Sequence, residues 1–457
     1  MIEGKADVVI VGGGVIGCSV AYHLLKMDPE LDIVVFEKSR TREGGSTALS
    51  ASAIRQQWIH PLNIALMKYS LRFYERIKNK IDLRQNGYLF LVERGHVRER
   101  KKVWKKQRRH GVNSIWVERK WIEEKFPYLN LPDKVVAGTF GPKDGFMPAR
   151  KVLNWFRHQL GELGRRKKNV RFHYEKVVTV NTHKGIVRGV ESLNRRILAP
   201  VVINAAGPWG KEVAEMADTN LPMIPIRREV FLVERLPGKK MREDYKVANK
   251  DRKIPWNLFR RKKIWIRSVR GILDFFREGK ISAEEKFLRD FKDMPMIVSP
   301  SGMYIRPFGD EVLTGELDPN APKGINLEFD DEFFIRRVRP KFMEYMPLIV
   351  KLRELFNSGK PFTHRGWAGM YAESHDHSAL LGESEVKGFY FANALSGHGL
   401  MQAPGIGKIV AWLVLRGDYP RITRNGKFVR RGKQVLNTRA FDYKNPPEKR
   451  PLEGAQL

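Results

Sequence analysis

The sequence is poor in cysteine and contains no long apolar stretch. A single cysteine, Cys18, stands among 457 residues, so no disulfide framework can form within the chain and a metal site built from cysteines is excluded. No apolar run approaches the length of a helix that spans a bilayer. We therefore expect a protein of a reducing compartment that is soluble or peripheral to a membrane and holds no metal.

Acidic residues are also scarce relative to basic ones. The chain has 84 lysines and arginines against 51 aspartates and glutamates, which gives a net charge of +33 and a pI near 10.1. This balance favours an anionic partner such as lipid headgroups or nucleic acid. No nucleic-acid recognition module accompanies the charge, so we expect no specific nucleic-acid partner, and a basic solvated surface accounts for most of these residues.

The length of the chain exceeds what one hydrophobic core usually serves. It predicts two domains, or one domain with a large interleaved insertion. A buried strand is expected at 6–11, with only five residues before it, so no targeting peptide is expected there. The protein is then cytoplasmic, or a presequence has been removed.

The N-terminal segment carries the strongest chemical signal. An apolar strand at 6–11, a glycine turn, a helical pattern at 15–27 and a strand at 32–36 form a β-α-β unit. In the turn Gly12 permits the sharp bend, Gly14 lets a pyrophosphate approach the backbone, and Gly17 allows close helix packing. Glu37 follows the second strand, where an acidic residue accepts hydrogen bonds from an adenosine ribose. The unit predicts a dinucleotide site at the start of the helix.

Several later segments have readable patterns. Residues 169–190 predict short strands, and 201–206 predicts a buried strand that ends in Gly-Pro. Residues 236–300 are a basic insertion with an amphipathic helix expected at 265–276, which either docks on an anionic surface or packs on the protein's own core. The basic tail from residue 421 is poorly patterned and is expected to be a loose arm.

The segment 389–407, FYFANALSGHGLMQAPGIG, predicts a strand, a glycine-rich loop and the start of an apolar helix. The free N–H groups and positive end of such a helix stabilise negative charge in front of it. A reduced isoalloxazine ring needs that field. His398 either adds to the field or is a loop histidine bonded to the backbone.

Together these motifs resemble the D-amino-acid oxidase-like flavoprotein family, which includes sarcosine and dimethylglycine oxidases and dehydrogenases. The resemblance runs from residue 6 to about 420 and includes GGSTALSAS at 44–52, NAAGPW at 204–209 and RGWAGMY at 365–371. It implies an α/β fold, with a three-layer, glutathione-reductase-like FAD-binding domain of Rossmann type interleaved with an α+β substrate domain.

The resemblance also implies domain limits. The FAD-binding domain would comprise 1–90, 145–220 and 361–420. The substrate or cap domain would comprise 91–144 and 221–360, including the basic insertion at 236–300. Residues 421–457 would form the C-terminal arm.

A set of cofactor-binding residues follows from the family motifs. Ser46 and Thr47 would contact the pyrophosphate and flavin side, Val177 would bind adenine through its backbone, and Ala206 and Gly207 would line the cleft. Residues 397–402 would lie against the pyrimidine edge of the flavin. The full expected set is Gly12, Gly14, Val15, Ile16, Gly17, Glu37, Lys38, Ser46, Thr47, Val177, Ala206, Gly207, Gly397, Gly399, Leu400, Met401 and Gln402.

Departures from the family pattern bear on the chemistry. Where some relatives attach the flavin through a histidine or cysteine, this chain has Ala48-Leu49 and Gly369, which implies non-covalent FAD. The sarcosine oxidases hold a substrate carboxylate with a lysine where this chain has Met401. Arg55 falls at their carboxylate-binding arginine, although a pyrophosphate-facing or surface position is an equal alternative.

Two functions remain open at this point. The first is oxidation of a small amino acid or N-methyl amine, with Arg55, His398 and Tyr371 as the candidate catalytic residues. The second is a flavin-containing assembly factor with little turnover, because the resemblance extends to mitochondrial flavoproteins that assist assembly of respiratory complex I. By resemblance the protein would be mitochondrial and peripheral on the matrix side of the inner membrane; a cytoplasmic location is the alternative. A protein partner or an anionic membrane face would contact the basic insertion.

The departures at Ala48, Leu49 and Gly369 generate a first prediction. FAD should co-purify with the protein and be released by acid or heat, because neither family position carries a side chain that can form a bond to the flavin. The measurement is the absorbance of supernatant and pellet after precipitation. Yellow colour that stays in the washed pellet would contradict the prediction.

Overall fold

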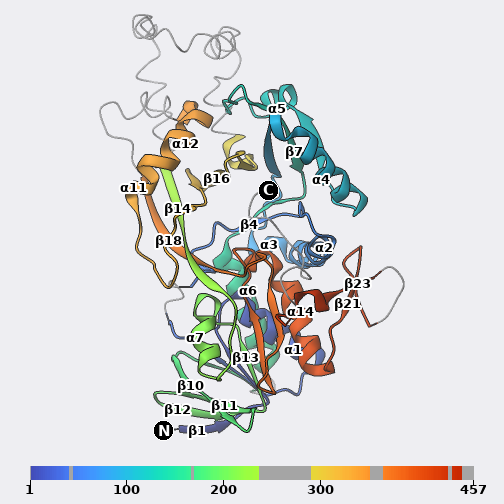
Figure 1. Ribbon diagram of the computed structural model, residues 1–457, viewed down its shortest axis with the longest axis vertical. Coiled ribbons are helices and arrows are strands. Elements are labelled where there is room, and N and C mark those ends of the chain that lie inside the picture. The colour runs from blue at the N-terminus through green and yellow to red at the C-terminus, as the bar shows by residue number, and fades with distance from the viewer. Residues whose placement is uncertain are drawn as a thin grey trace, which may run out of the picture.

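The computed structural model describes residues 2–40, 45–165, 169–235, 290–349, 364–430 and 435–444. These residues form a Rossmann-type domain, which contains the N-terminus, and a cap domain that stands above it in Figure 1. The amphipathic helix expected at 265–276 lies outside the described residues, as does most of the basic insertion.

The Rossmann-type domain is built around a six-stranded sheet whose inner strands are buried on both faces. Every residue of β2 (Val8–Val11) is apolar; Val8 and Ile10 face one layer, while Val9 and Val11 face the other. Neighbouring strands are parallel except for β19 with β20. In order, the strands are β19 (Leu380–Glu383), β20 (Phe389–Asn393), β13 (Val201–Asn204), β2, β3 (Ile33–Phe36) and β9 (Val170–His173).

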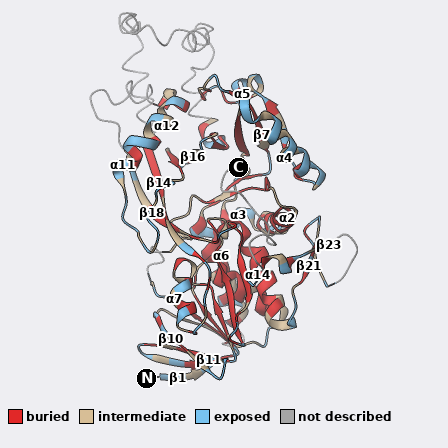
Figure 2. Cartoon of the chain, viewed as in Figure 1, coloured by how far each residue is buried: buried red, intermediate tan, exposed pale blue. Residues whose placement is uncertain are grey.

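Two different layers cover this sheet and complete the three-layer fold that the sequence predicts. Helices cover one face, and a second sheet packs on the other through residues such as Val180 and Val190. Figure 2 shows the buried residues concentrated between these layers. The second sheet consists of β1 (Ile2–Lys5), β12 (Arg195–Leu198), β11 (Ile186–Ser192) and β10 (Val177–His183). The helices are α1 (Val15–Met27), α2 (Pro61–Arg76), α6 (Ala149–Arg165) and α14 (Gly399–Arg416).

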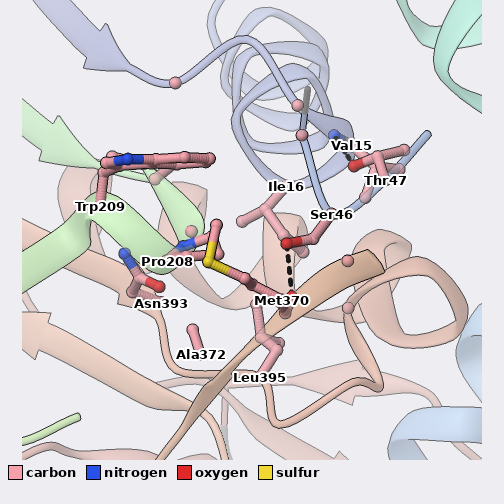
Figure 3. Close-up of a pocket in the computed structure, with 18 of the residues that line it drawn as sticks. Val15, Ile16, Ser46, Thr47, Pro208, Trp209, Met370, Ala372, Asn393 and Leu395 are labelled. Atoms are coloured by element: carbon pink, nitrogen blue, oxygen red, sulfur yellow. Dashed lines mark hydrogen bonds between the residues drawn. The ribbon is translucent and has the colours of Figure 1, made fainter. Parts of the chain in front are cut away.

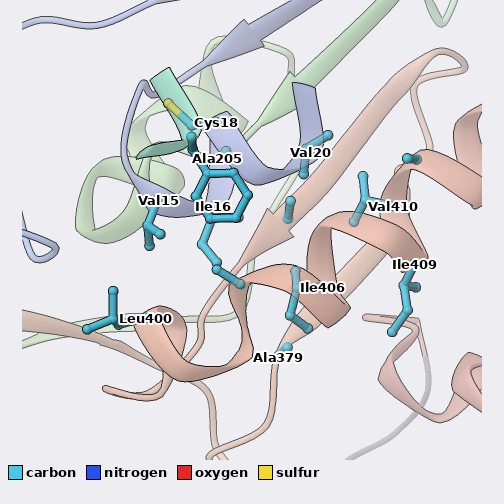
Figure 4. Close-up of a cluster of buried hydrophobic side chains, with 14 of the residues drawn as sticks. Val15, Ile16, Cys18, Val20, Ala205, Ala379, Leu400, Ile406, Ile409 and Val410 are labelled. Atoms are coloured by element: carbon cyan, nitrogen blue, oxygen red, sulfur yellow. The ribbon is translucent and has the colours of Figure 1, made fainter. Parts of the chain in front are cut away.

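Helices α1 and α14 lie directly against each other. Ile16 of α1 and Val410 of α14 belong to one buried cluster (Figure 4). At the crossing, a Cβ atom on Gly407 would lie only 2.4 Å from the Ser19 hydroxyl oxygen. That hydroxyl donates a hydrogen bond of 2.7 Å to the carbonyl of Ala403 on α14. The crossing therefore fixes the position of both helices, including the points at which they begin.

The cap domain is built on an eight-stranded sheet with two different faces. Along β5, Leu89 and Leu91 enter a core shared with the cap helices, whereas Tyr88 and Phe90 point to the opposite face. In order, the strands are β18 (His364–Glu373), β14 (Ile224–Arg235), β17 (Glu311–Gly315), β16 (Tyr304–Phe308), β15 (Met296–Val298), β5 (Tyr88–Glu93), β7 (Val135–Gly141) and β6 (Ile115–Glu118). The cap helices are α4 (Val97–Arg109), α5 (Arg119–Lys125), α11 (Asp331–Phe333) and α12 (Arg339–Tyr345).

Two segments differ from the expectation. The end of the segment 236–300 is not part of an insertion, because β15 pairs with both β5 and β16 inside the cap sheet. The described parts of the tail, 421–430 and 435–444, are not a loose arm, because Ile422 and Phe441 are fully buried and a small sheet forms there. A few apolar residues spaced among basic ones are enough to hold it. The sheet consists of β22 (Phe428–Val429), β21 (Arg421–Thr423) and β23 (Val435–Asn437).

Further short helices and strands lie within the described ranges. They are α3 (Lys78–Ile81), α7 (Gly210–Glu215), and the paired strands β4 (Ala53–Ile54) and β8 (Gly145–Phe146). Across the described ranges, no helix combines the length and the apolar character needed to cross a membrane.

The helix crossing generates a second prediction, in which two glycines are compared. Gly407→Ala should lower the free energy of unfolding by about 1–3 kcal/mol, because the new methyl group collides with Ser19 in a packed core. Gly161→Ala is the matched control on α6, where an added Cβ meets no atom within 4 Å. It should raise stability by about 0.5–1 kcal/mol through the loss of glycine's backbone freedom. Urea unfolding measures both, and equal effects of the two changes would contradict the close crossing.

Candidate functional site

A long cavity runs along the carboxyl ends of the parallel strands. Its volume is about 1520 Å³, including the part open to solvent, and residues just after β2, β3, β13 and β20 line it. Carboxyl ends of parallel strands are where α/β folds bind their ligands. Of the residues expected to bind FAD, those that line the long cavity are Gly12, Gly14, Val15, Ile16, Glu37, Lys38, Ser46, Thr47, Val177, Ala206, Gly207, Gly397, Gly399 and Leu400.

The N-termini of α1 and α14 both open into the long cavity. Neither N-cap residue, Gly14 or His398, bonds a first-turn N–H group through its own side chain, and neither helix carries an acidic residue in its first turn. Their first residues, including Val15 of α1 and Gly399 of α14, line the cavity. Two positive helix ends therefore face one space, which is suited to a ligand with negative charge at two separate places.

Glycines bring the first turn close to its neighbours. Gly12 has a φ of +111°, and a Cβ atom there would lie 2.3 Å from the carbonyl oxygen of Ala205. Gly17 does not line the cavity; a Cβ atom there would lie 1.9 Å from the Gly12 carbonyl oxygen. Gly17 thus contributes indirectly to the cavity, because its lack of a side chain lets α1 pack closely against the turn that forms the cavity wall.

One end of the long cavity carries the acidic residue after β3. The Glu37 carboxylate accepts hydrogen bonds from Gly13 N at 3.0 Å and Ser39 N at 3.1 Å. Beside it, Lys38 Nζ lies 2.9 Å from the centre of the Trp209 ring, and burial lowers the pKa of Lys38. Figure 3 shows the Trp209 ring among the residues that line the cavity. Trp209 was missed in the sequence, where it reads as part of a turn after a strand.

The loop at 45–52 forms part of the wall of the long cavity. Thr47 Oγ1 accepts a hydrogen bond of 3.2 Å from Val15 N, and Ser46 Oγ donates one of 2.6 Å to the Met370 carbonyl (Figure 3). The loop therefore connects the start of α1 with β18. Ser46 and Thr47 hold the cavity wall as well as lining it.

A side cavity of about 1020 Å³ adjoins the long cavity and lies beneath the cap sheet. The two cavities share seven lining residues, among them Tyr304, Tyr371 and Gly397. Tyr88 and Phe90 belong to the side cavity alone, on the face of β5 that points away from the cap core. The cap sheet thus provides an aromatic wall next to the end of the long cavity.

Arg55 lines the side cavity and not the long one. Its side chain is nearly buried, with 9% of the residue exposed, and it donates a hydrogen bond to the Gln57 carbonyl. The guanidinium carbon lies 4.0 Å from the centre of the Trp58 ring and 5.5 Å from that of Phe90. The structure therefore places Arg55 neither on the surface nor among the residues of the glycine turn.

A buried carboxylate holds the segment that carries Arg55. Asp144 accepts hydrogen bonds from Gln56 N at 2.8 Å and from Gln57 Nε2 at 3.2 Å. Burial raises the pKa of Asp144 to about 7, although these hydrogen bonds oppose the shift. Nothing in the sequence pointed to Asp144, because its partners are about ninety positions away.

His398 does not add positive charge to the field at the start of α14. Its ring lies edge-on to Trp58, with ring centres 4.5 Å apart, and it lines the side cavity. Burial lowers the pKa of His398 well below its usual value, and nearby Arg55 and His377 lower it further. The imidazole is therefore neutral, and the helix end itself supplies the positive potential.

Tyr371 stands at the junction of the two cavities. Its ring packs on the 396–398 loop so closely that a Cβ atom on Gly397 would lie 2.3 Å from Tyr371 Cε2. Burial raises the pKa of Tyr371, so its hydroxyl keeps its proton. The guanidinium of Arg228 lies 5.4 Å from the ring centre. Arg228 also donates a hydrogen bond of 2.7 Å to Glu373, a pair that the sequence did not reveal.

The last two expected residues lie away from the long cavity. Met401 lines the side cavity. Gln402 is buried in the first turn of α14 and lines neither cavity. The described ranges hold no group of side chains arranged to bind a metal ion.

Comparisons with known proteins agree with this geometry. The profile of the DAO family, described as FAD dependent oxidoreductase, matches residues 7–413. FAD-dependent oxidoreductase domain-containing protein 1 of Bos taurus is 27% identical over 92% of this chain and 83% of its own length. Mitochondrial dimethylglycine dehydrogenase of Rattus norvegicus is 26% identical over 91% of this chain, which spans 44% of that relative. The crystal structure of L-proline dehydrogenase from P. horikoshii superposes on this chain with a TM-score of 0.71 and 22% sequence identity. The match covers 97% of this chain and 98% of that one, and it shows that the two share a fold.

The residues present fit the FAD that this family uses. Gly12 and Gly14 leave a cradle at the start of α1, two positive helix ends face the cavity, and the Glu37 carboxylate stands after the second strand. The expected cofactor is thus confirmed by the family match, which spans most of the chain. The chain belongs to the DAO family of FAD-dependent oxidoreductases.

Proposed function

We propose that the protein oxidises an N-alkylated amino acid, or another secondary amine, at the carbon next to the nitrogen. The observation that carries the proposal is the placement of Arg55 in the side cavity, beside the long cavity and under an aromatic wall. A guanidinium binds a carboxylate through paired, charge-assisted hydrogen bonds. Dimethylglycine dehydrogenase, among the relatives, is named for such a substrate.

The residues of the side cavity have distinct roles in this proposal. Bound FAD supplies the oxidant, which takes up a hydride from the carbon next to the amine nitrogen. Arg55 orients the substrate through its carboxylate, while Trp58 and Phe90 hold the guanidinium flat. Tyr88 and Tyr304 exclude water from the cavity and present ring faces to a cationic nitrogen.

Non-covalent attachment of FAD is part of the proposal. The two positions at which relatives form a covalent bond lie side by side, since a Cβ atom on Gly369 would be 3.2 Å from Leu49 Cβ. Neither Gly369 nor the Ala48-Leu49 pair offers a nucleophilic atom. The arrangement therefore supports FAD held by the cavity alone.

An assembly role with little turnover is the second candidate, and Met401 favours it. An apolar side chain lines the side cavity where the sarcosine oxidases have a lysine, so one charge for substrate binding is missing. A protein partner in respiratory complex I assembly belongs to this candidate. A mitochondrial location belongs to both, on the strength of relatives whose names include mitochondrial dimethylglycine dehydrogenase.

One experiment separates the two candidates. N-methyl amino acids are added without oxygen to the purified protein with its FAD, and the flavin absorbance is followed. Bleaching by at least one of them supports the oxidoreductase. A protein that retains FAD but is bleached by none of them contradicts it and leaves the assembly role.

Arg55 generates a third prediction. Arg55→Ala should weaken binding of the best N-methyl amino acid by about 1.5–3 kcal/mol, the worth of a hydrogen bond to a charged group, with FAD content unchanged. Arg336→Ala is the control, because the Arg336 side chain is 80% exposed on the cap. Binding is measured by calorimetry with the dithionite-reduced protein, in which the amine cannot be oxidised. Loss of FAD from Arg55→Ala would instead assign Arg55 to the cofactor.

The buried carboxylate gives a fourth prediction, on the pH dependence of stability. Folding raises the pKa of Asp144 from 3.8 to about 7, so the folded state holds this proton more tightly than the unfolded state. Its contribution to stability is full below the unfolded pKa and is lost as pH rises through about 7. As the pH is raised from 3.8 to about 7, the wild type should therefore lose stability relative to Asp144→Asn. Urea unfolding across that range tests this, with the exposed Asp133→Asn as control; parallel pH profiles of wild type and Asp144→Asn would refute it.

A further inference from the structure

His377 occupies a fixed position in the wall of the side cavity. It follows β18 and lines the cavity together with Arg55 and Glu373. Its backbone φ is +56°, in the left-handed region that few residues other than glycine adopt. Asp376 holds the loop, because its carboxylate accepts hydrogen bonds from Ser374 Oγ at 2.9 Å and Ser378 N at 3.2 Å. Non-glycine residues in such conformations cluster at functional sites.

The charged and titratable neighbours of His377 come from four parts of the chain. His377 Nδ1 lies 3.8 Å from Glu373 Oε2 on β18. The other oxygen of Glu373 accepts a hydrogen bond of 2.7 Å from Arg228 on β14. Arg55 lines the same cavity, and His398 stands before α14. Glu373 is therefore shared between a guanidinium and an imidazole.

The proposed reaction needs a proton acceptor in this cavity. An amino acid amine arrives protonated at neutral pH, and its nitrogen then has no electron pair. That electron pair must be free to stabilise the carbon from which the hydride leaves. The amine must therefore lose a proton before the carbon–hydrogen bond is broken.

The other titratable groups of the side cavity are poorly suited to take that proton. Burial raises the pKa of Tyr88 to about 12, and it also raises the pKa values of Tyr304 and Tyr371, so all three hydroxyls stay protonated. The pKa of His398 is lowered well below its usual value, which makes it a weak base. Glu373 is held by Arg228.

We propose that His377 is the base that deprotonates the substrate amine, with the Glu373 carboxylate beside its other ring nitrogen. The inference rests on the proposed function. In this step the N–H bond of the ammonium breaks, the electron pair stays on the substrate nitrogen, and an N–H bond forms on His377 Nε2. The proton can pass on to solvent, because the His377 side chain is 30% exposed. Imidazole is the side chain that exchanges protons most readily near neutral pH.

The variant that tests the proposal is His377→Asn, because asparagine tolerates a left-handed backbone. His375→Asn is the matched control, an exposed histidine two positions away in the same loop. With the N-methyl amino acid that bleaches the flavin fastest, His377→Asn should slow anaerobic bleaching at neutral pH about 10²–10⁴-fold, the usual contribution of a general base. Its rate should then rise with pH into the alkaline range, and added imidazole should restore part of it. His375→Asn should behave as the wild type.

Binding gives a second readout that does not depend on turnover. For the dithionite-reduced wild type, affinity for the same amine should fall as pH is lowered through the range in which imidazole takes up a proton, because imidazolium repels ammonium. In His377→Asn this fall should be absent. At pH values above that range, the affinity of His377→Asn should differ from that of the wild type by less than about threefold, which is well below the effect of losing one hydrogen bond to a charged group.

The outcomes separate this inference from the proposed function. If the wild type is bleached and His377→Asn shows the same rate and pH profile, the base assignment is wrong while the oxidoreductase stands. A slow variant that imidazole does not restore and that has lost affinity shows a structural role and also overturns the assignment. If no N-methyl amino acid bleaches the wild type, both proposals fall together.

Discussion

The contact between α1 and α14 is the constraint on which the site depends. Gly407 brings the two backbones together against Ser19, so the helices cannot slide or separate without breaking the core between them. The N-termini of both helices then face the long cavity. In the binding mode that the family motifs imply, one helix end would meet the pyrophosphate and the other the ring system of the same dinucleotide. The spacing of two charges on the ligand would then be set by a contact in the protein core.

The cap sheet uses the two-residue period of a strand to build two structures at once. Leu89 and Leu91 fill the cap core. Tyr88 and Phe90, which alternate with them along the strand, form the wall of the side cavity. The cap core and the cavity lining are thereby separated onto opposite faces of β5. Under the proposed function, a change on the cavity face would alter substrate recognition with little effect on the core beneath it.

The sequence revealed local features of this site and missed the non-local ones. The glycine turn and Glu37 were predictable because their spacing within one β-α-β unit is dictated by backbone geometry. The family match and the three layers followed from such motifs. Asp144 and the Arg228–Glu373 pair were not predictable, because their partners are far away in sequence and meet only through strand pairing. The neutral state of His398 depends on burial, which spacing alone does not give.

The sheet topology has a consequence for how the chain assembles during synthesis. β13 pairs on one side with β2 and on the other with β20, and β20 begins only at Phe389. The sheet of the N-terminal nucleotide-binding unit therefore cannot be completed until most of the chain, as far as β20, has been synthesised. Pairings over such separations make folding slow, and the unpaired edge of β13 is open to other chains in the meantime. The order of the strands thus makes the C-terminal part of the chain, from β20 onward, a requirement for closing the first sheet.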